Sequence, residues 1–223
     1  MPKGAPLCNW RQDKAHSEWQ NWNEPARRPR RPGAYSPFAP AKHLRTPIPL
    51  PMPATPDDLF AFLDRLAIPH PTVAHAALFT VDESQALRGE IPGGHTKNLF
   101  LKDKKGALYL VTALEDAAIE LKSLHRRLGA SGRFSFGPAE QMREVLGIEP
   151  GAVTPFAAMN DTTRRVTVVL DKALMAYPVI NCHPLRNTMT TSIARDDLVK
   201  FLEATGHRPR IEPVAEPQAS APP

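Results

Sequence analysis

The sequence has little cysteine, few aromatic residues and no long apolar run. Cys8 and Cys182 are the two cysteines among 223 residues, and their separation suits neither a disulfide framework nor a C-x-x-C metal pair, which favours a reducing compartment. Aromatic residues make up 7% of the chain, so its core must be mainly aliphatic. No apolar stretch approaches the roughly 20 residues of a membrane helix, and the start lacks the apolar centre of a secretion signal. We therefore expect a cytoplasmic protein without a membrane partner.

The sequence after residue 51 carries almost no net charge, although the whole chain has a formal charge of +5. Residues 1–51 hold nine Lys/Arg and three Asp/Glu, whereas the remaining residues hold 19 and 20. The basicity of the whole chain is therefore no argument for nucleic-acid binding, and any contact with RNA requires local basic patches. DNA is not an expected partner.

Residues 1–51 are predicted to form a disordered Pro/Arg-rich extension. They contain ten of the 25 prolines and the run RRPRRP at 27–32, and their apolar residues follow no helical or strand period. The alternatives are a basic arm that helps to hold RNA, a transit peptide, or a natural start at Met52. Residues 52–206 are predicted to be one folded domain, and residues 207–223 a disordered tail.

Helical and extended patterns are interspersed along residues 52–206. Thr55 and Pro56 suit the start of a helix whose apolar stripe runs from Leu59 to Leu66. Further helices are expected at 82–87, 117–128, 138–146 and 195–205, and strands at 72–79, 97–102, 107–114, 166–170, 179–182 and 188–193. Asp103–Gly106 is predicted to join two strands as a hairpin. This order predicts a mixed α/β (α+β) fold, a single domain with a mostly antiparallel, barrel-like sheet flanked by helices, and not a doubly wound parallel sheet.

The most informative stretch is GGHTKNLFLKDKKG at 93–106. Lys97 and Asn98 open a strand that is apolar on both faces, which predicts a central strand. An ammonium at the mouth of such a strand loses hydration, so an anionic partner such as a phosphate gives a physical reason for Lys97. The alternative is a lysine that reaches water from the strand end.

Two further stretches supply candidate site residues. The loop GIEPGAVTPFAAMND at 147–161 could form the wall of a pocket for a small side chain, and its backbone N–H groups could hold an oxyanion; an ordinary structural loop is the alternative. In Asn181–Pro184, Cys182 and His183 are adjacent and face opposite ways, which disfavours a Cys–His nucleophilic pair and favours a core cysteine. A zinc site with His95 lacks ligand-pair spacing, and no G-x-S-x-G elbow marks a serine hydrolase.

Together these stretches resemble the YbaK-type aminoacyl-tRNA deacylase family, and most closely its prolyl-tRNA editing branch, the free-standing alanyl-tRNA(Pro) deacylases. HTKNLFLKDKKG at 95–106, GAVTP at 151–155 and NCHP at 181–184 occur in the family's order, over about residues 54–206. The first motif is specific, and the other two are weak when taken alone.

The resemblance implies a hydrolase that removes a wrongly attached amino acid from the 3′ adenosine of tRNA by water attack, without a metal or other cofactor. It implies catalytic roles for Lys97, Asn98 and His183, with Lys97 holding the terminal phosphate. It implies a substrate-binding wall made of Gly151, Ala152, Val153, Thr154 and Pro155, with Phe100 as a further contact. Ala157 and Ala158 would add small walls. The implied partner is the acceptor end of tRNA(Pro), with prolyl-tRNA synthetase or an elongation factor as further candidates.

Several alternatives stay open at this stage. The substrate could be cysteinyl-tRNA(Pro) instead of alanyl-tRNA(Pro), or the chain could be a non-catalytic module that binds tRNA or a synthetase. A third hypothesis is an enzyme that forms a Schiff base with its substrate through Lys97. Acceptor-stem contacts are expected from scattered cations, namely Lys102, Lys104, Lys105, Arg126, Arg127, Arg133 and Arg164.

Overall fold

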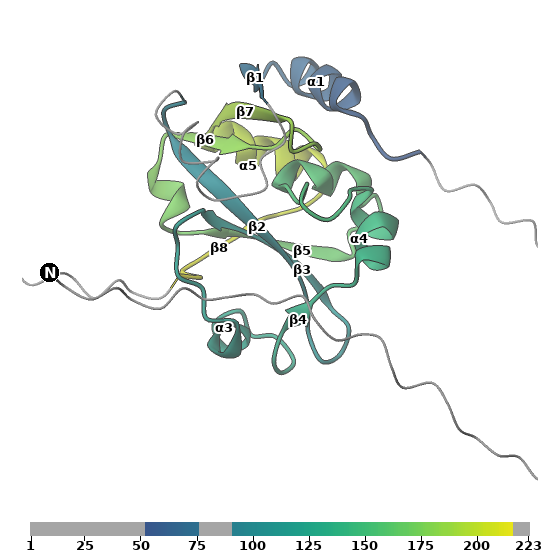
Figure 1. Cartoon of the computed structure of the whole chain (residues 1–223), viewed down its shortest axis with the longest axis vertical. Helices are drawn as coiled ribbons and strands as arrows, with labels where there is room; N and C mark the ends of the chain where they lie inside the picture. The colour runs from purple at the N-terminus through teal and green to yellow at the C-terminus, as the bar shows by residue number, and fades with distance from the viewer. Residues whose placement is uncertain (1–51, 76–90, 216–223) are drawn as a thin grey trace, which may run out of the picture. The chain divides into compact units, whose positions relative to one another are not determined.

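The computed structural model describes residues 52–75 and 91–215, which belong to one compact unit (Figure 1). Its strands form one sheet in the order β1-β7-β6-β2-β3-β5-β8, and β4 pairs with β2. The strand bounds are β1 Thr72–Ala74, β2 Gly94–Lys102, β3 Leu108–Leu114, β4 Ser135–Phe136, β5 Val166–Asp171, β6 Val179–Cys182, β7 Met189–Ala194 and β8 Arg210–Glu212.

The predicted fold class is confirmed. Neighbours β1–β7, β6–β7, β2–β3 and β2–β4 are antiparallel, while β2–β6, β3–β5 and β5–β8 are parallel. The sheet is therefore mixed and mostly antiparallel. It does not close into a barrel, because β1 and β8 form its two ends.

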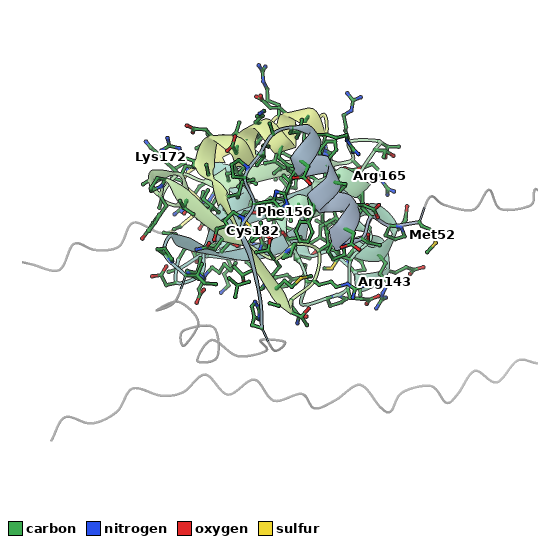
Figure 2. The ribbon with its side chains drawn as sticks, turned by 90° about the horizontal axis from the view of Figure 1, so that it is seen from above. Met52, Arg143, Phe156, Arg165, Lys172 and Cys182 are labelled. Atoms are coloured by element: carbon green, nitrogen blue, oxygen red, sulfur yellow. The ribbon has the colours of Figure 1, made fainter. Side chains whose placement is uncertain are left out.

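Helices cover both faces of the sheet, so a central strand is buried on each side. One face packs against α1 (Pro56–Arg65), α4 (Ala139–Leu146), the short 3-10 helix η1 (Pro155–Asn160) and α5 (Arg195–Ala204). The other face packs against α3 (Leu121–Arg127), and a second 3-10 helix, η2 (Leu174–Ala176), links β5 to β6. Figure 2 shows Phe156 and Cys182 inside the molecule, with Met52, Arg143, Arg165 and Lys172 at its surface.

The residues that start α1 behave as their types predict. The Thr55 side chain accepts a hydrogen bond from the backbone N–H of Asp58 at 3.2 Å, and the Asp58 carboxylate accepts one from the backbone N–H of Thr55 at 2.8 Å. This reciprocal capping satisfies two donors that the helix end leaves free. Leu59 and Leu63 then reach the core, one turn apart.

The β2–β3 hairpin is confirmed, and it is fastened to the segment that leads into β4. Gly106 has φ +90°, a conformation that its lack of a side chain permits. The Asp103 carboxylate accepts hydrogen bonds from the backbone N–H groups of Lys105, Ala107 and Ser131, each at 2.9 Å. Because these donors favour the charged form, the pKa of Asp103 is lowered.

Two expectations differ from the structure. The helix expected from 117 begins only at Leu121, since Ala117 closes a turn by donating its N–H to the carbonyl of Leu114. The ordered domain also continues past the predicted limit at residue 206. Arg210–Glu212 forms β8 along β5, and Val214 is fully buried and donates its N–H to Asp171. Composition hid this strand, because three residues show no period and gain their order from pairing.

Other expectations concern residues that the structure leaves undescribed. The extension 1–51, the helix at 82–87 and the second half of the strand at 72–79 fall outside the described residues. Among residues 52–75 and 91–215, none of the helices has the length and apolarity that spanning a bilayer requires.

Candidate active site

One small pocket joins the three stretches that the sequence singled out. Its volume is about 230 Å³, and its lining residues are Thr96, Lys97, Asn98, Gly151, Val153 and His183. Of the residues predicted for the site, Lys97, Asn98, Gly151, Val153 and His183 thus surround one space. Drug-sized ligands occupy pockets of roughly 300–1,000 Å³, so this pocket suits a smaller group.

Strand pairing explains why the pocket lies beside β2. β2 pairs with β6 only at Gly94 and His95, and with β4 only at Leu101 and Lys102. Among the described residues, no strand pairs with that edge of β2 over residues 96–100, and the pocket opens there. Figure 1 shows β2 crossing the sheet between β6 and β3. Gly93 allows the close approach to β6, because a Cβ there would lie 2.8 Å from the carbonyl oxygen of Val179.

Lys97 lines the pocket and is half-buried. Its ammonium donates a hydrogen bond to the carbonyl of Ala117. Burial lowers the pKa of Lys97, and the nearby Asp116 carboxylate opposes that shift. An ammonium has three donors, so two N–H groups remain for an anion after the hydrogen bond to Ala117.

The side chain of Asn98 is oriented by a neighbour on β3. Thr112, which is fully buried, donates its hydroxyl to Oδ1 of Asn98 at 2.8 Å. The register of the hairpin places these two residues directly opposite each other. Because the amide oxygen is occupied, the NH₂ group is the part of Asn98 that can donate to a ligand.

His183 directly follows β6 and is held in one tautomer. Its Nδ1 lies 3.1 Å from the carbonyl oxygen of Met189. A carbonyl only accepts, so Nδ1 carries the proton and Nε2 is the acceptor nitrogen of the neutral ring. Burial lowers the pKa of His183; the hydrogen bond to Met189 opposes this, and the nearby His75 adds to it. The site therefore holds a neutral imidazole at neutral pH.

The loop from Gly151 to Pro155 forms one wall of the pocket, and the start of η1 holds it in place. Gly151 has φ +91°, and a Cβ there would meet no atom within 4 Å. An alanine at this position would strain the backbone and place its methyl group in open space. The side chain of Thr154 caps η1 by accepting from the N–H of Phe156, and Pro155 takes the first position of that helix.

Four predicted site residues do not line the pocket. Ala152, Thr154 and Pro155 are buried behind the wall. Phe100 belongs to the core, with 2% exposure, and its ring lies so close to Gly137 that a Cβ there would clash at 2.3 Å. Alternation along β2 correctly puts Phe100 on the same face as Asn98. At Phe100, however, that face is covered by other residues, among them Gly137. Two further residues that were expected to form small walls, Ala157 and Ala158, are also buried in the core.

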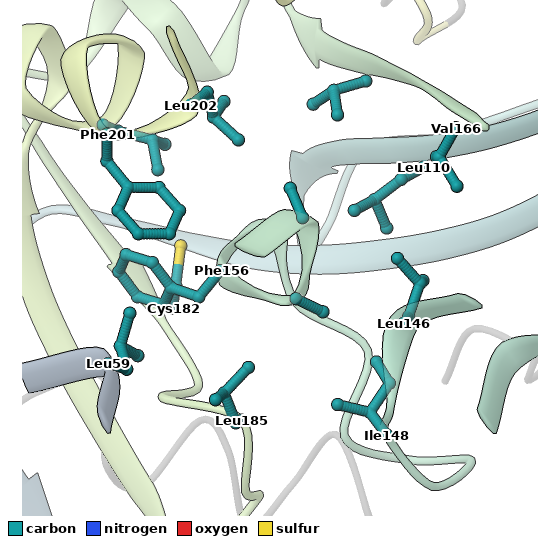
Figure 3. Close-up of a cluster of buried hydrophobic side chains, with 14 of the residues drawn as sticks. Leu59, Leu110, Leu146, Ile148, Phe156, Val166, Cys182, Leu185, Phe201 and Leu202 are labelled. Carbon is teal, nitrogen blue, oxygen red and sulfur yellow. The ribbon is translucent and has the colours of Figure 1, made fainter. Parts of the chain in front are cut away.

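Cys182 is a core residue, as its type predicted. It lies among Phe156, Phe201 and Leu59 (Figure 3). Burial raises the pKa of its thiol to about 12, although the hydroxyl of Thr96 donates toward the sulfur. A thiol with that pKa is not a nucleophile at neutral pH. Within the described residues, no group of three or more His, Cys, Asp or Glu side chains is placed to hold a metal ion.

Sequence reasoning missed Thr96 and Thr112. Thr96 lines the pocket and donates its hydroxyl to the carbonyl of Asn181 at 2.8 Å, which ties β2 to β6. Thr112 orients Asn98. The hairpin register, counted outward from Asp103–Gly106, could have paired Thr112 with Asn98.

The chain contains a known class of domain. The family model described as aminoacyl-tRNA editing domain matches residues 75–201, and the chain belongs to this family. The motif-based resemblance is therefore confirmed at the level of the family.

The chain is similar to curated proteins whose names refer to prolyl-tRNA editing or to prolyl-tRNA synthetase. A Danio rerio protein named prolyl-tRNA synthetase associated domain-containing protein 1 is 41% identical over 156 residues, which cover 69% of this chain and 84% of that protein. The prolyl-tRNA editing protein ProX of Acetoanaerobium sticklandii is 35% identical over 150 residues, covering 67% and 91%. The crystal structure of a candidate trans-editing enzyme for prolyl tRNA synthetase matches with a TM-score of 0.56 at 20% identity, covers 74% of this chain and 99% of that one, and supports the fold.

Proposed function

We propose that this chain is a trans-editing hydrolase that deacylates mischarged tRNA(Pro), with alanyl-tRNA(Pro) as its main substrate. The observation that carries the proposal is the pocket in which Lys97, Asn98 and His183 meet the wall of Gly151 and Val153. The prolyl-tRNA editing names of its relatives support the choice of tRNA.

The groups in the pocket suit hydrolysis of an activated ester without a protein nucleophile. In the proposed reaction Lys97 holds the terminal phosphate of the tRNA, and the NH₂ group of Asn98 donates to the substrate. Nε2 of His183 accepts from the α-ammonium group or from the attacking water. Water adds to the ester carbonyl, assisted by the ribose 2′-hydroxyl; the bond from carbonyl carbon to ribose oxygen then breaks, and that oxygen takes the proton. Positioning and oriented donors are the main sources of acceleration in such a site.

Size exclusion explains why a separate pocket is useful. A binding pocket gains only about 1–3 kcal/mol of discrimination from one methylene, so a site built for proline cannot strongly reject alanine. A second pocket that admits alanine but excludes the larger proline ring would hydrolyse alanyl-tRNA(Pro) and leave prolyl-tRNA(Pro) intact.

Hydrolysis of alanyl-, cysteinyl- and prolyl-tRNA(Pro), measured side by side, tests the proposal. We expect alanyl-tRNA(Pro) to be hydrolysed roughly 100-fold faster or more than prolyl-tRNA(Pro), the scale that a few carbons can provide. A faster reaction with cysteinyl-tRNA(Pro) would assign cysteine as the substrate instead. Binding of all three without hydrolysis would make the chain a non-catalytic tRNA-binding module.

The dependence of kcat/KM on pH should show both titrating groups. The pKa of His183 is lowered from 6.5, so the neutral ring should persist, and activity should hold, until the pH falls below that value. The pKa of Lys97 is lowered from 10.5, so activity should fall on the alkaline side before that value is reached. Spontaneous ester hydrolysis must be subtracted at each pH. In His183→Gln the acid limb should disappear, and an unchanged acid limb would contradict the assignment.

A further inference from the structure

A second surface, outside the pocket, presents an exposed aromatic ring beside a group of cations. Phe136 is 62% exposed, whereas its neighbour Phe134 is 9% exposed and packs edge-on against Tyr109. Burial in the fold therefore accounts for Phe134 but not for Phe136. A large aromatic ring left in water marks a contact site when polar groups suited to a partner surround it.

Phe136 lies beside the same strand that carries Lys97. β4 pairs with β2 so that Phe136 is directly opposite Leu101. Residues two apart share a face of a strand, so Lys97 and Leu101 lie on one face of β2, and Phe136 adjoins it. Four residues along a strand span about 13 Å. From Thr96 to Phe100 the edge of β2 toward β6 and β4 has no strand partner among the described residues.

Four cations belong to the segments that meet at this end of β2, and we call them the basic rim: Lys102 at the end of β2, Lys104 and Lys105 in the turn that follows it, and Arg133 before β4. Lys104 packs over Gly132, which brings the hairpin turn against the segment before β4. The carboxylate in the turn, Asp103, is buried and accepts three backbone N–H groups. After Arg133, the first acidic residue in the sequence is Glu140, at the start of α4. The basic rim is therefore a local positive excess on a domain with 19 basic and 20 acidic residues after position 51.

A single RNA strand is the partner whose chemistry fits both features. Lys and Arg neutralise phosphates, and exposed aromatic rings stack on unpaired bases. An acidic protein surface would use the cations but would have no base to place on the ring. About 13 Å corresponds to about four nucleotides at a stacked rise of about 3.4 Å, which is the scale of an unpaired 3′ end.

We propose that Phe136 and the basic rim form a second RNA-binding surface, on which an unpaired base of the acceptor end stacks while the cations hold the flanking phosphates. The inference rests on the proposed function, because the pocket at Lys97 is what fixes the terminal nucleotide. It adds a contact several nucleotides away from the reacting ester.

Binding of uncharged tRNA(Pro) to the full-length chain tests the stacking contact without requiring catalysis. We expect Phe136→Ala to weaken binding roughly 5- to 100-fold, as for loss of one base stack. Phe136→Trp, which keeps an aromatic face, should bind within about twofold of the unchanged protein. Ile211→Ala is the matched control, since Ile211 is 51% exposed on β8, at the end of the sheet. It should bind unchanged.

The basic rim is tested by the salt dependence of the same binding. The pair Lys104→Gln and Arg133→Gln should reduce the slope of log K against log salt by about one for each phosphate that the variant no longer neutralises. Lys172→Gln, at an exposed position after β5, is the control and should leave the slope unchanged. An unchanged slope in the double variant would remove these cations from the proposed surface.

Deacylation separates failure of this surface from failure of the proposed function. Phe136→Ala should lower kcat/KM on alanyl-tRNA(Pro) but not on alanyl-adenosine, which has no preceding nucleotides. If folded Phe136→Ala binds tRNA as tightly as the unchanged protein, the proposed second surface is wrong. The proposed function still stands in that case if the unchanged protein deacylates alanyl-tRNA(Pro). If the unchanged protein hydrolyses no aminoacyl-tRNA, yet Phe136→Ala loses binding, the surface stands and the proposed function fails.

Discussion

Replacing Lys97 by alanine is expected to lower kcat/KM for alanyl-tRNA(Pro) roughly 100- to 1,000-fold, the range seen when one oriented charged or polar donor is removed. Lys97 is the half-buried cation that lines the pocket, and its one hydrogen-bond partner within the described part of the chain is the neutral carbonyl of Ala117. Without it, the terminal phosphate would enter the pocket with its charge uncompensated. Single-turnover deacylation by folded protein measures the effect.

Control variants separate charge from structure. Lys122→Ala removes an exposed lysine from α3 and should leave kcat/KM unchanged. Lys97→Arg keeps the charge but not the shape of the ammonium, so we expect partial activity. Borohydride treatment with substrate should trap no adduct, because the proposed reaction has no imine. Full activity of folded Lys97→Ala would contradict the central role of this residue.

Replacing Asp161 by alanine should reduce the free energy of unfolding by about 3 kcal/mol or more, because more than one buried donor loses its acceptor at about 1–3 kcal/mol each. Asp161 is 2% exposed and follows η1. Its carboxylate accepts from the N–H of Val166 at 2.8 Å and lies 3.2 Å from Nε2 of His207, which is also buried. Alanine would leave these groups buried without an acceptor.

Denaturant unfolding monitored by circular dichroism measures this loss. Asp161→Asn keeps an acceptor oxygen, so it should cost clearly less than Asp161→Ala. Burial alone would raise the pKa of Asp161, but hydrogen bonds from His207 and from the backbone of Arg165 and Val166 outweigh it, and the pKa is lowered from 3.8. The stability from Asp161 is therefore present above that value and is lost as the pH falls through the lowered pKa. Equal stability of Asp161→Ala and the unchanged protein would contradict the assignment.

The residues of the pocket could be found from the sequence because their types are unusual where they stand. A lysine at the mouth of an apolar strand and a loop rich in glycine and proline each require an explanation, and the family motifs supplied one for Lys97, Gly151 and His183. Phe100, Thr154 and Pro155 were also assigned to the site, because they stand in the same family motifs as these residues. They are buried, because proximity in sequence does not say which side of a strand or loop a helix will cover.

The sequence alone was enough to predict the family, the mixed fold, the central strand and the core cysteine, since all of these depend on local pattern and residue type. Only the tertiary structure showed the tautomer of His183, the hydrogen bond from Thr112 to Asn98, the strand β8 and the exposed ring of Phe136. Each depends on which residues from distant parts of the chain meet. A hydrogen bond, a strand pairing or an uncovered ring is a property of two segments together, and neither segment carries it by itself.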